Sequence, residues 1–221
     1  MTPKETPGRP GSGLPRTAPL AMVETAFLAS TASLLWIASF YLGLTPFLRL
    51  FFPLPLALAY LRWGRRAGWM TLVTTTLLLA VLMGPPRGLV YICRYGFLGV
   101  ALGYFWRSGR GWGLTVAVGT VLSTVGFFAQ IALLSLLSGE DLWVYVVNQV
   151  SQLLANLLDF FGILAQPQPL WISVGMLATV AGFSVLYVAV VQVVAWVLLE
   201  RLGPHPMAAP PAWVQVILGL E

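Results

Sequence analysis

The feature that most constrains this chain is a series of long apolar runs with few or no charged residues. Residues 112–137 and 170–199 contain no Asp, Glu, Lys or Arg. Across the 221 residues, 58% are hydrophobic and only 9% are charged, whereas a soluble domain is about one quarter charged. Runs of this length can span a bilayer, where every backbone N–H and C=O must be hydrogen-bonded within the protein. The sequence therefore predicts an all-α, polytopic membrane helical bundle.

Six apolar runs are assigned to membrane spans, and the second of them is short. The runs cover residues 22–44, 54–61 with help from 47–53, 69–84, 88–105, 112–137 and 170–199. Pro46, Pro53 and Pro55 prevent a regular helix over residues 45–55. We therefore expect a hydrophobic loop that leads into a short or tilted helix. The prediction is about six transmembrane helices plus an outer amphipathic or re-entrant helix.

The two ends of the chain differ from its apolar middle. Residues 1–20 carry five prolines and three glycines and are expected to form a disordered cytoplasmic tail. Residues 21–203 are the expected transmembrane domain, and residues 204–221 the expected C-terminal cytoplasmic tail. A cleaved signal peptide is the competing interpretation of the N-terminus, but Glu24 interrupts the apolar stretch.

The distribution of basic residues predicts the orientation. With a cytoplasmic N-terminus and six crossings, nine basic residues lie inside and only Arg49 and Arg87 lie outside. The nine are Lys4, Arg9, Arg16, Arg62, Arg65, Arg66, Arg107, Arg110 and Arg201. This bias favours a multi-pass protein of a bacterial inner (plasma) membrane with both termini in the cytoplasm. Residues 140–165 are long enough to span as well, and the alternative with seven crossings would place Arg201 outside.

One segment, residues 141–160, carries a polar stripe along an otherwise apolar helix. Its polar residues fall within a sector of about 100° on a helical wheel. They are Asp141, Tyr145, Asn148, Gln149, Gln152, Asn156 and Asp159. The stripe lacks Lys and Arg, unlike the polar face of most interfacial helices. Two interpretations remain open: the stripe lines a wet cleft near the outer face, or its amides join helices together.

Arg94 is the second unusual polar residue, because it lies inside the predicted fourth span. An arginine at membrane depth is expected to face the bundle interior or a water-filled cavity and to have a partner. Asp159 is the first candidate for that partner and a bound anionic ligand is the second, while snorkelling to the outer surface needs neither. Arg49 could close over the same cleft, although a solvated loop charge is the simpler interpretation.

Small residues mark places where helices can approach closely. Ala26, Ser30 and Ser33 form one strip on the first span, and Ala29 and Ser33 form a second pair. Gly99 and Gly103 form a GxxxG pattern in the fourth span. Such patterns occur within a fold and between subunits, and packing within the fold is the default interpretation.

Several classes of chemistry have no support in the sequence. There is no G-x-x-x-x-G-K-[ST] motif, so ATP-driven work would require a separate ATPase. The single histidine, His205, follows the last span, and the single cysteine, Cys93, lies in an apolar run. We therefore expect no metal site, no cofactor, no nucleic-acid partner and no enzymatic activity.

The order of these segments carries a resemblance. A first span with small residues (AFLASTASLL) is followed by a Pro-containing loop that enters a short span (FFPLPLALAYLRWGRRAG), a Gly-Pro-capped third span and a last span closing in VLLERLG. Over roughly residues 22–203 the chain resembles the YybS-like family of bacterial membrane proteins. That family is similar to the six-helix substrate-capture subunits of energy-coupling-factor transporters.

The resemblance implies a six-helix bundle whose outward cleft binds a small molecule under the loop between the first two spans. It implies a coupling surface on the first helix, at Ala26, Ala29, Ser30 and Ser33, although serine stands here where the family has alanine. The implied partners are a transmembrane coupling protein and two cytoplasmic ATPases, besides membrane lipid.

Two functional hypotheses follow. In the first, the chain is the substrate-binding subunit of a small-molecule, vitamin-type uptake transporter. Its ligand-binding residues are then Arg94, Asn148, Gln149, Gln152, Asn156 and Asp159. In the second, it is a non-transporting membrane scaffold or assembly factor that uses the small-residue strips and the polar stripe to hold other membrane proteins.

Overall fold

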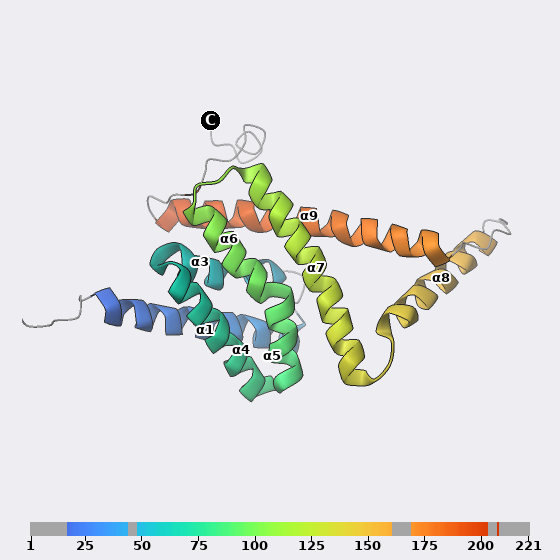
Figure 1. Cartoon of the computed structure of the whole chain (residues 1–221), viewed down its shortest axis with the longest axis horizontal. Helices are drawn as coiled ribbons and strands as arrows, with labels where there is room; N and C mark the ends of the chain where they lie inside the picture. Colours follow the sequence, from blue (N-terminus) through green and yellow to red (C-terminus); the bar gives the residue numbers. More distant parts are fainter. Residues whose placement is uncertain (1–16, 44–47, 161–168, 203–206, 208–221) are drawn as a thin grey trace, which may run out of the picture.

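The apolar runs form helices, as a protein surrounded by lipid requires. A computed structural model describes residues 17–43, 48–160, 169–202 and 207, and no strand occurs among them. In chain order the elements are α1 (Thr17–Leu42), the 3-10 turn η1 (Arg49–Phe51), α3 (Leu54–Trp63), α4 (Arg65–Met83), α5 (Pro85–Tyr91), the π-helix η2 (Ile92–Gly96), α6 (Phe97–Arg107), α7 (Trp112–Ser138), α8 (Leu142–Phe160) and α9 (Pro169–Leu202). Figure 1 shows their arrangement.

Five helices in the described part of the chain are long and apolar enough to cross a membrane. They are Pro19–Leu42, Arg65–Met83, Pro85–Arg107, Trp112–Ser138 and Leu170–Arg201. The all-α membrane bundle predicted from the sequence is therefore confirmed. The expected short second helix is present as α3, which has only ten residues and rises roughly 15 Å, but it is not among these five helices. The described residues therefore contain five candidate spans where the sequence predicts about six. The polar α8 is not among these five helices.

The short helix α3 lies at the centre of the bundle. It packs against α1, α4 and α6, and seven of its ten residues are buried. The GxxxG pair of α6 makes the contact with α3 possible. A Cβ atom on Gly99 would lie 2.9 Å from the Pro53 carbonyl oxygen, and one on Gly103 would lie 2.8 Å from that of Ala57. The pattern therefore serves packing within the chain.

The two small-residue strips of α1 point in different directions. Ala29 and Ser33 are fully buried, and the Thr75 hydroxyl of α4 donates a hydrogen bond to the Ala29 carbonyl oxygen at 3.4 Å. This contact places Ala29 and Ser33 inside the bundle and corrects their assignment to a partner surface. Ala26 and Ser30 are exposed. Of the four residues assigned to the coupling surface, Ala26 and Ser30 therefore remain accessible to another protein.

The N-terminal boundary of the bundle lies earlier than the sequence suggests. Helix α1 begins at Thr17, so residues 17–20 belong to it and not to a tail. Pro19 does not prevent this, because proline is tolerated in the first turn of a helix, where its missing N–H would have no partner. The rest of the predicted N-terminal tail, and the C-terminal tail apart from Met207, lie outside the described residues.

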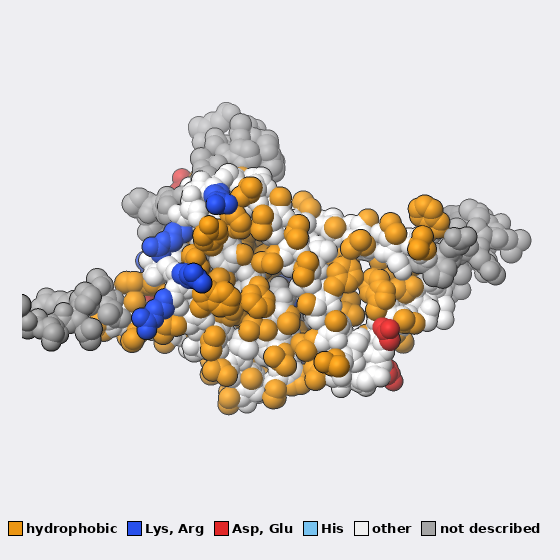
Figure 2. All heavy atoms as spheres, in the orientation of Figure 1, with side chains coloured by type: hydrophobic (Ala, Val, Ile, Leu, Met, Phe, Trp, Pro, Cys, Tyr) orange, Lys and Arg blue, Asp and Glu red, His pale blue; other side chains and the backbone are white. Residues whose placement is uncertain are grey.

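The exposed charges are separated along the molecule. Arginine side chains gather at the left of Figure 2, at the α3–α4 and α6–α7 junctions. They are Arg62, Arg65, Arg66, Arg107 and Arg110. Arg62 pairs with Glu24 of α1, which also accepts a hydrogen bond from the Trp63 indole at 2.8 Å. The acidic residues Glu140 and Asp141 lie at the opposite end, between α7 and α8.

Candidate functional site

Arg94 is positioned by a local departure from regular helix. The segment Ile92–Gly96 is a π-helix between α5 and α6, and Arg94 lies roughly 13 Å along the span from Pro85. Helix α7 approaches this segment closely at Gly126, where a Cβ atom would lie 2.7 Å from the Cys93 carbonyl oxygen. Single π-turns inside α-helices are frequent at functional sites.

The guanidinium group of Arg94 is held by neutral groups. Its Nε–H donates to the Tyr95 hydroxyl at 3.1 Å, and its Nη1 donates to the Gln130 side-chain oxygen at 3.2 Å. The Arg94 Cζ atom lies 5.0 Å from the centroid of the Phe127 ring. Arginine has five N–H donors, so three are left without an acceptor among the described residues. No described carboxylate forms an ion pair with Arg94.

Arg94 and Arg49 open onto the same two cavities. The first, here called the α1 cavity, has a volume of about 350 Å³. It is lined by Trp36, Ser39, Phe40, Arg49, Phe52, Val90, Arg94, Tyr95, Phe127 and Gln130. The second, the α9 cavity, has about 340 Å³. It is lined by Arg49, Arg94, Tyr95, Ser123, Phe127, Val180, Phe183, Ser184 and Tyr187.

Arg49 is fixed in this position through its backbone. The Tyr187 hydroxyl of α9 donates a hydrogen bond to the Arg49 carbonyl oxygen at 2.8 Å. Although its side chain is largely exposed, Arg49 is part of the wall of both cavities and is not an isolated loop charge.

A third arginine lies beside the α1 cavity. The Arg87 Cζ atom stacks 3.9 Å from the centroid of Phe40, which lines that cavity. Arg49 and Arg87 are the two arginines that the sequence assigns to the outer side. Together with Arg94 they surround one site, and no described Asp or Glu lines either cavity. The site therefore favours a negatively charged ligand.

The polar stripe of α8 lies away from Arg94. Asn148, Gln149 and Gln152 are exposed, whereas Val147 on the opposite face of the helix is buried. Neither arginine cavity contains a residue of the stripe. The side chains of Asn156 and Asp159 lie outside the described residues, so the expected pairing of Asp159 with Arg94 stays a prediction.

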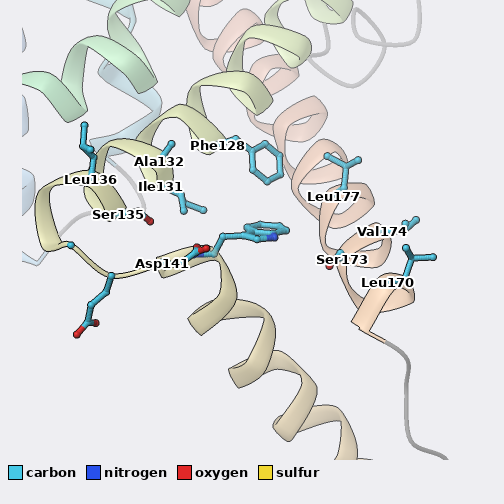
Figure 3. A pocket seen from close by; sticks show the side chains of 13 residues that line it. Phe128, Ile131, Ala132, Ser135, Leu136, Asp141, Leu170, Ser173, Val174 and Leu177 are labelled. Carbon is cyan, nitrogen blue, oxygen red and sulfur yellow. The ribbon is translucent and has the colours of Figure 1, made fainter.

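A larger cavity, of about 1100 Å³, lies between α7, α8 and α9 (Figure 3). Most of its lining is apolar, including Phe128 and Trp143, whose ring centroids are 5.3 Å apart. Its carboxylates, Glu140 and Asp141, come from the turn that leads into α8. Asp141 caps that helix, because its carboxylate oxygen accepts hydrogen bonds from the backbone N–H groups of Trp143 and Val144. This apolar cavity has few groups that could orient a polar ligand.

Sequence reasoning identified Arg94 and named Arg49 as a residue that could lie over the same cleft, but it missed Gln130 and most of the surrounding aromatic residues. Gln130 is the only amide side chain in the apolar run 112–137, which is a signal that could have been used. The aromatic residues Trp36, Phe52, Phe127 and Tyr187 carry no such signal, because aromatic side chains are common in apolar spans.

Comparison with known proteins bears on the membrane assignment. The model of a family described as predicted membrane protein (DUF2232) matches residues 30–170, which is more than half of the chain. The chain belongs to this family. The expectation of a membrane protein family with no stated activity is thereby confirmed. No curated protein and no solved structure matches the chain.

The DUF2232 region contains most of the arginine site. It includes Trp36, Arg49, Arg87, Arg94 and Gln130, which come from α1, η1, α5, η2 and α7. The α9 residues that complete the α9 cavity, Val180 to Tyr187, follow the matched region. The α1 cavity therefore lies wholly within the part of the chain that defines the family.

Proposed function

We propose that this protein is an integral membrane substrate-binding subunit that captures a small anionic molecule at Arg94. One observation carries the proposal: Arg94 lies within a span, opens onto two cavities together with Arg49, and has no described carboxylate partner. A charge at membrane depth is costly unless another group replaces its lost hydration. An anionic ligand supplies that replacement through the three N–H donors that Tyr95 and Gln130 leave unused.

The surrounding arginines support capture from the outer side. Arg49 and Arg87 place two more positive charges beside the α1 cavity. Converging charges of one sign in a cleft with low-dielectric walls raise the local concentration of an oppositely charged solute and its association rate. The aromatic walls lower the local dielectric constant and so strengthen the attraction between the ligand and Arg94.

The transport role in this proposal rests on the resemblance of the chain to the substrate-capture subunits of energy-coupling-factor transporters. In this proposal the protein serves small-molecule uptake in a bacterial inner membrane, with both termini cytoplasmic and without catalysis or a cofactor. A transmembrane coupling protein and cytoplasmic ATPases, the arrangement of energy-coupling-factor transporters, supply the energy. The exposed pair Ala26 and Ser30 on α1 is the part of the predicted coupling surface that remains accessible.

A scaffold or assembly factor is the second candidate. The observation that favours it is the exposure of Asn148, Gln149 and Gln152 on α8, since amides can join membrane proteins through hydrogen bonds. The two candidate functions depend on different parts of the protein. A scaffold depends on α8 and not on Arg94.

Ligand-induced thermal stabilisation of the purified protein tests the proposal. Small carboxylates and phosphate esters are added individually, and the uncharged amide of each carboxylate serves as a matched ligand control. An anion at 100 times its dissociation constant adds about 2.7 kcal/mol to the free energy of unfolding. Arg94→Gln should remove this stabilisation, whereas Arg110→Gln, at the opposite basic end, should retain it.

If no anion stabilises the wild-type protein, or if Arg94→Gln responds as the wild type does, binding at Arg94 is excluded. Co-purification then separates the two roles. A transporter subunit is recovered with an ATPase complex, and Asn148→Ala together with Gln152→Ala leaves that recovery intact. Loss of all partners in this double variant would favour the scaffold.

A further inference from the structure

The α1 cavity has an unusually aromatic wall. Five of its ten lining residues are aromatic: Trp36, Phe40, Phe52, Tyr95 and Phe127. The first of these, Trp36, packs at the centre of a ring cluster. Its ring centroid is 5.1 Å from that of Phe52 and 5.6 Å from that of Tyr95, the latter in an edge-to-face arrangement. The rings hold one another in place, so the wall is preformed.

The orientation of Arg94 leaves one edge of its guanidinium group for a ligand. Tyr95 takes the Nε–H, and Gln130 takes one hydrogen of Nη1. The second hydrogen of Nη1 and both hydrogens of Nη2 remain available to donate to a ligand. A planar carboxylate can accept two parallel hydrogen bonds from that pair of nitrogens, which is the preferred geometry of arginine with carboxylates.

The volume of the α1 cavity limits the size of the ligand. A volume of about 350 Å³ corresponds to roughly a dozen water molecules at about 30 Å³ each. One ring, or two fused rings, with a single acidic group fits such a space.

We propose that the α1 cavity binds a small aromatic carboxylate, with its carboxylate on Arg94 and its ring between Trp36, Phe52 and Phe127. This inference rests on the proposed function and narrows it to one class of ligand. The aromatic walls distinguish such a ligand from an aliphatic acid of equal size and charge. Ring pairs in offset or edge-to-face contact gain about 0.5–1.5 kcal/mol beyond area burial. Each contact therefore tightens binding roughly twofold to tenfold.

A pair of matched acids tests this inference. Benzoate and cyclohexanecarboxylate have the same carbon count and the same charge, but only benzoate has an aromatic ring. Binding to the purified full-length protein is measured by calorimetry, with benzamide and inorganic phosphate as further probes. We expect benzoate to bind at least threefold more tightly than cyclohexanecarboxylate and benzamide to bind far more weakly than either acid.

Substitutions of the aromatic residues in the wall of the α1 cavity show which side chains cause the preference for benzoate. Trp36→Leu should reduce the preference for benzoate by roughly twofold to tenfold and leave the affinity for cyclohexanecarboxylate nearly unchanged. Phe127→Leu, at a partly exposed position, serves the same purpose if Trp36→Leu does not fold. Trp69→Leu is the control, because Trp69 of α4 is 41% exposed and lines neither arginine cavity.

The outcomes separate this inference from the proposed function. Equal affinities for the two carboxylates, or preferential binding of phosphate, would overturn the aromatic assignment and leave anion binding at Arg94 standing. A preference for benzoate that is undiminished in both Trp36→Leu and Phe127→Leu would also overturn it. If none of the anions binds, the proposed function itself fails.

Discussion

At the scale of single residues, the site combines one side chain that the sequence identifies with several that it does not. Arg94 stands out because arginine is rare inside a span. Its partners depend on rotation about the helix axis, and the π-turn at Ile92–Gly96 changes that rotation. A regular 3.6-residue period therefore does not predict that Arg94 faces Gln130 of α7.

The pairing of Arg94 with Gln130 can be measured with a double-mutant cycle. We expect Arg94→Gln and Gln130→Ala to be coupled by about 1.5–3 kcal/mol in the free energy of unfolding, because the hydrogen bond has a charged donor and is partly buried. Unfolding in detergent with increasing SDS gives the four free energies. Gln149→Ala is the matched control, since Gln149 is exposed on α8 and should show no coupling with Arg94. Zero coupling at Gln130 would show that the hydrogen bond contributes nothing to stability.

At the scale of helices, apolar length and small residues predict much of the arrangement. The prolines at positions 46, 53 and 55 predict the short second helix, and the structure contains it as α3. The GxxxG pattern predicts a close contact, but not that α3 is the partner of α6. That choice depends on long-range packing, because small residues permit close approach without specifying the neighbour. For the same reason, the sequence did not predict that Ala29 and Ser33 face α4 and not another protein.

The contact between α3 and α6 gives a prediction at this scale. Gly103→Ala should lower the free energy of unfolding by about 1–3 kcal/mol, because its Cβ would lie 2.8 Å from the Ala57 carbonyl oxygen and 2.6 Å from the Tyr60 Cβ. Gly113→Ala on α7 is the matched control. A Cβ atom added there would have no atom within 4 Å apart from its chain neighbours and its own helix backbone, so the substitution should be neutral or slightly stabilising. Thermal unfolding of the two variants provides the comparison, and equal stabilities would refute the close-packing argument.

At the scale of the whole molecule, all described arginines except Arg201 fall into two groups. The exposed group at the α3–α4 and α6–α7 junctions forms one end of the bundle, as the positive-inside rule predicts. Arg49 and Arg87, which the sequence assigns to the outer side, gather with Arg94 around the α1 cavity. The positions of the charged residues in the sequence are enough to single out these three arginines. Their convergence requires the folded bundle, because they come from η1, α5 and η2.

The separation of these two groups predicts the topology, and cysteine labelling in intact cells can measure it. Cys93 is the only cysteine, so Cys93→Ala provides a background without thiols. Single cysteines replace Arg65, Arg110, Glu140 and Arg201, all of which are exposed. Glu140 is preferred to its neighbour Gly139, whose φ of +73° would strain any other residue.

With both termini cytoplasmic, a membrane-impermeant maleimide added to intact cells should label only Glu140→Cys. The other three cysteines should react only after the cells are opened, which also serves as the control that each thiol is accessible. The physical reason is that arginine-rich short loops are retained on the cytoplasmic side during insertion. Labelling of Arg201→Cys from outside would instead show that α8 crosses the membrane. In that case the polar stripe would lie at membrane depth, and α9 would run in the opposite direction across the bilayer.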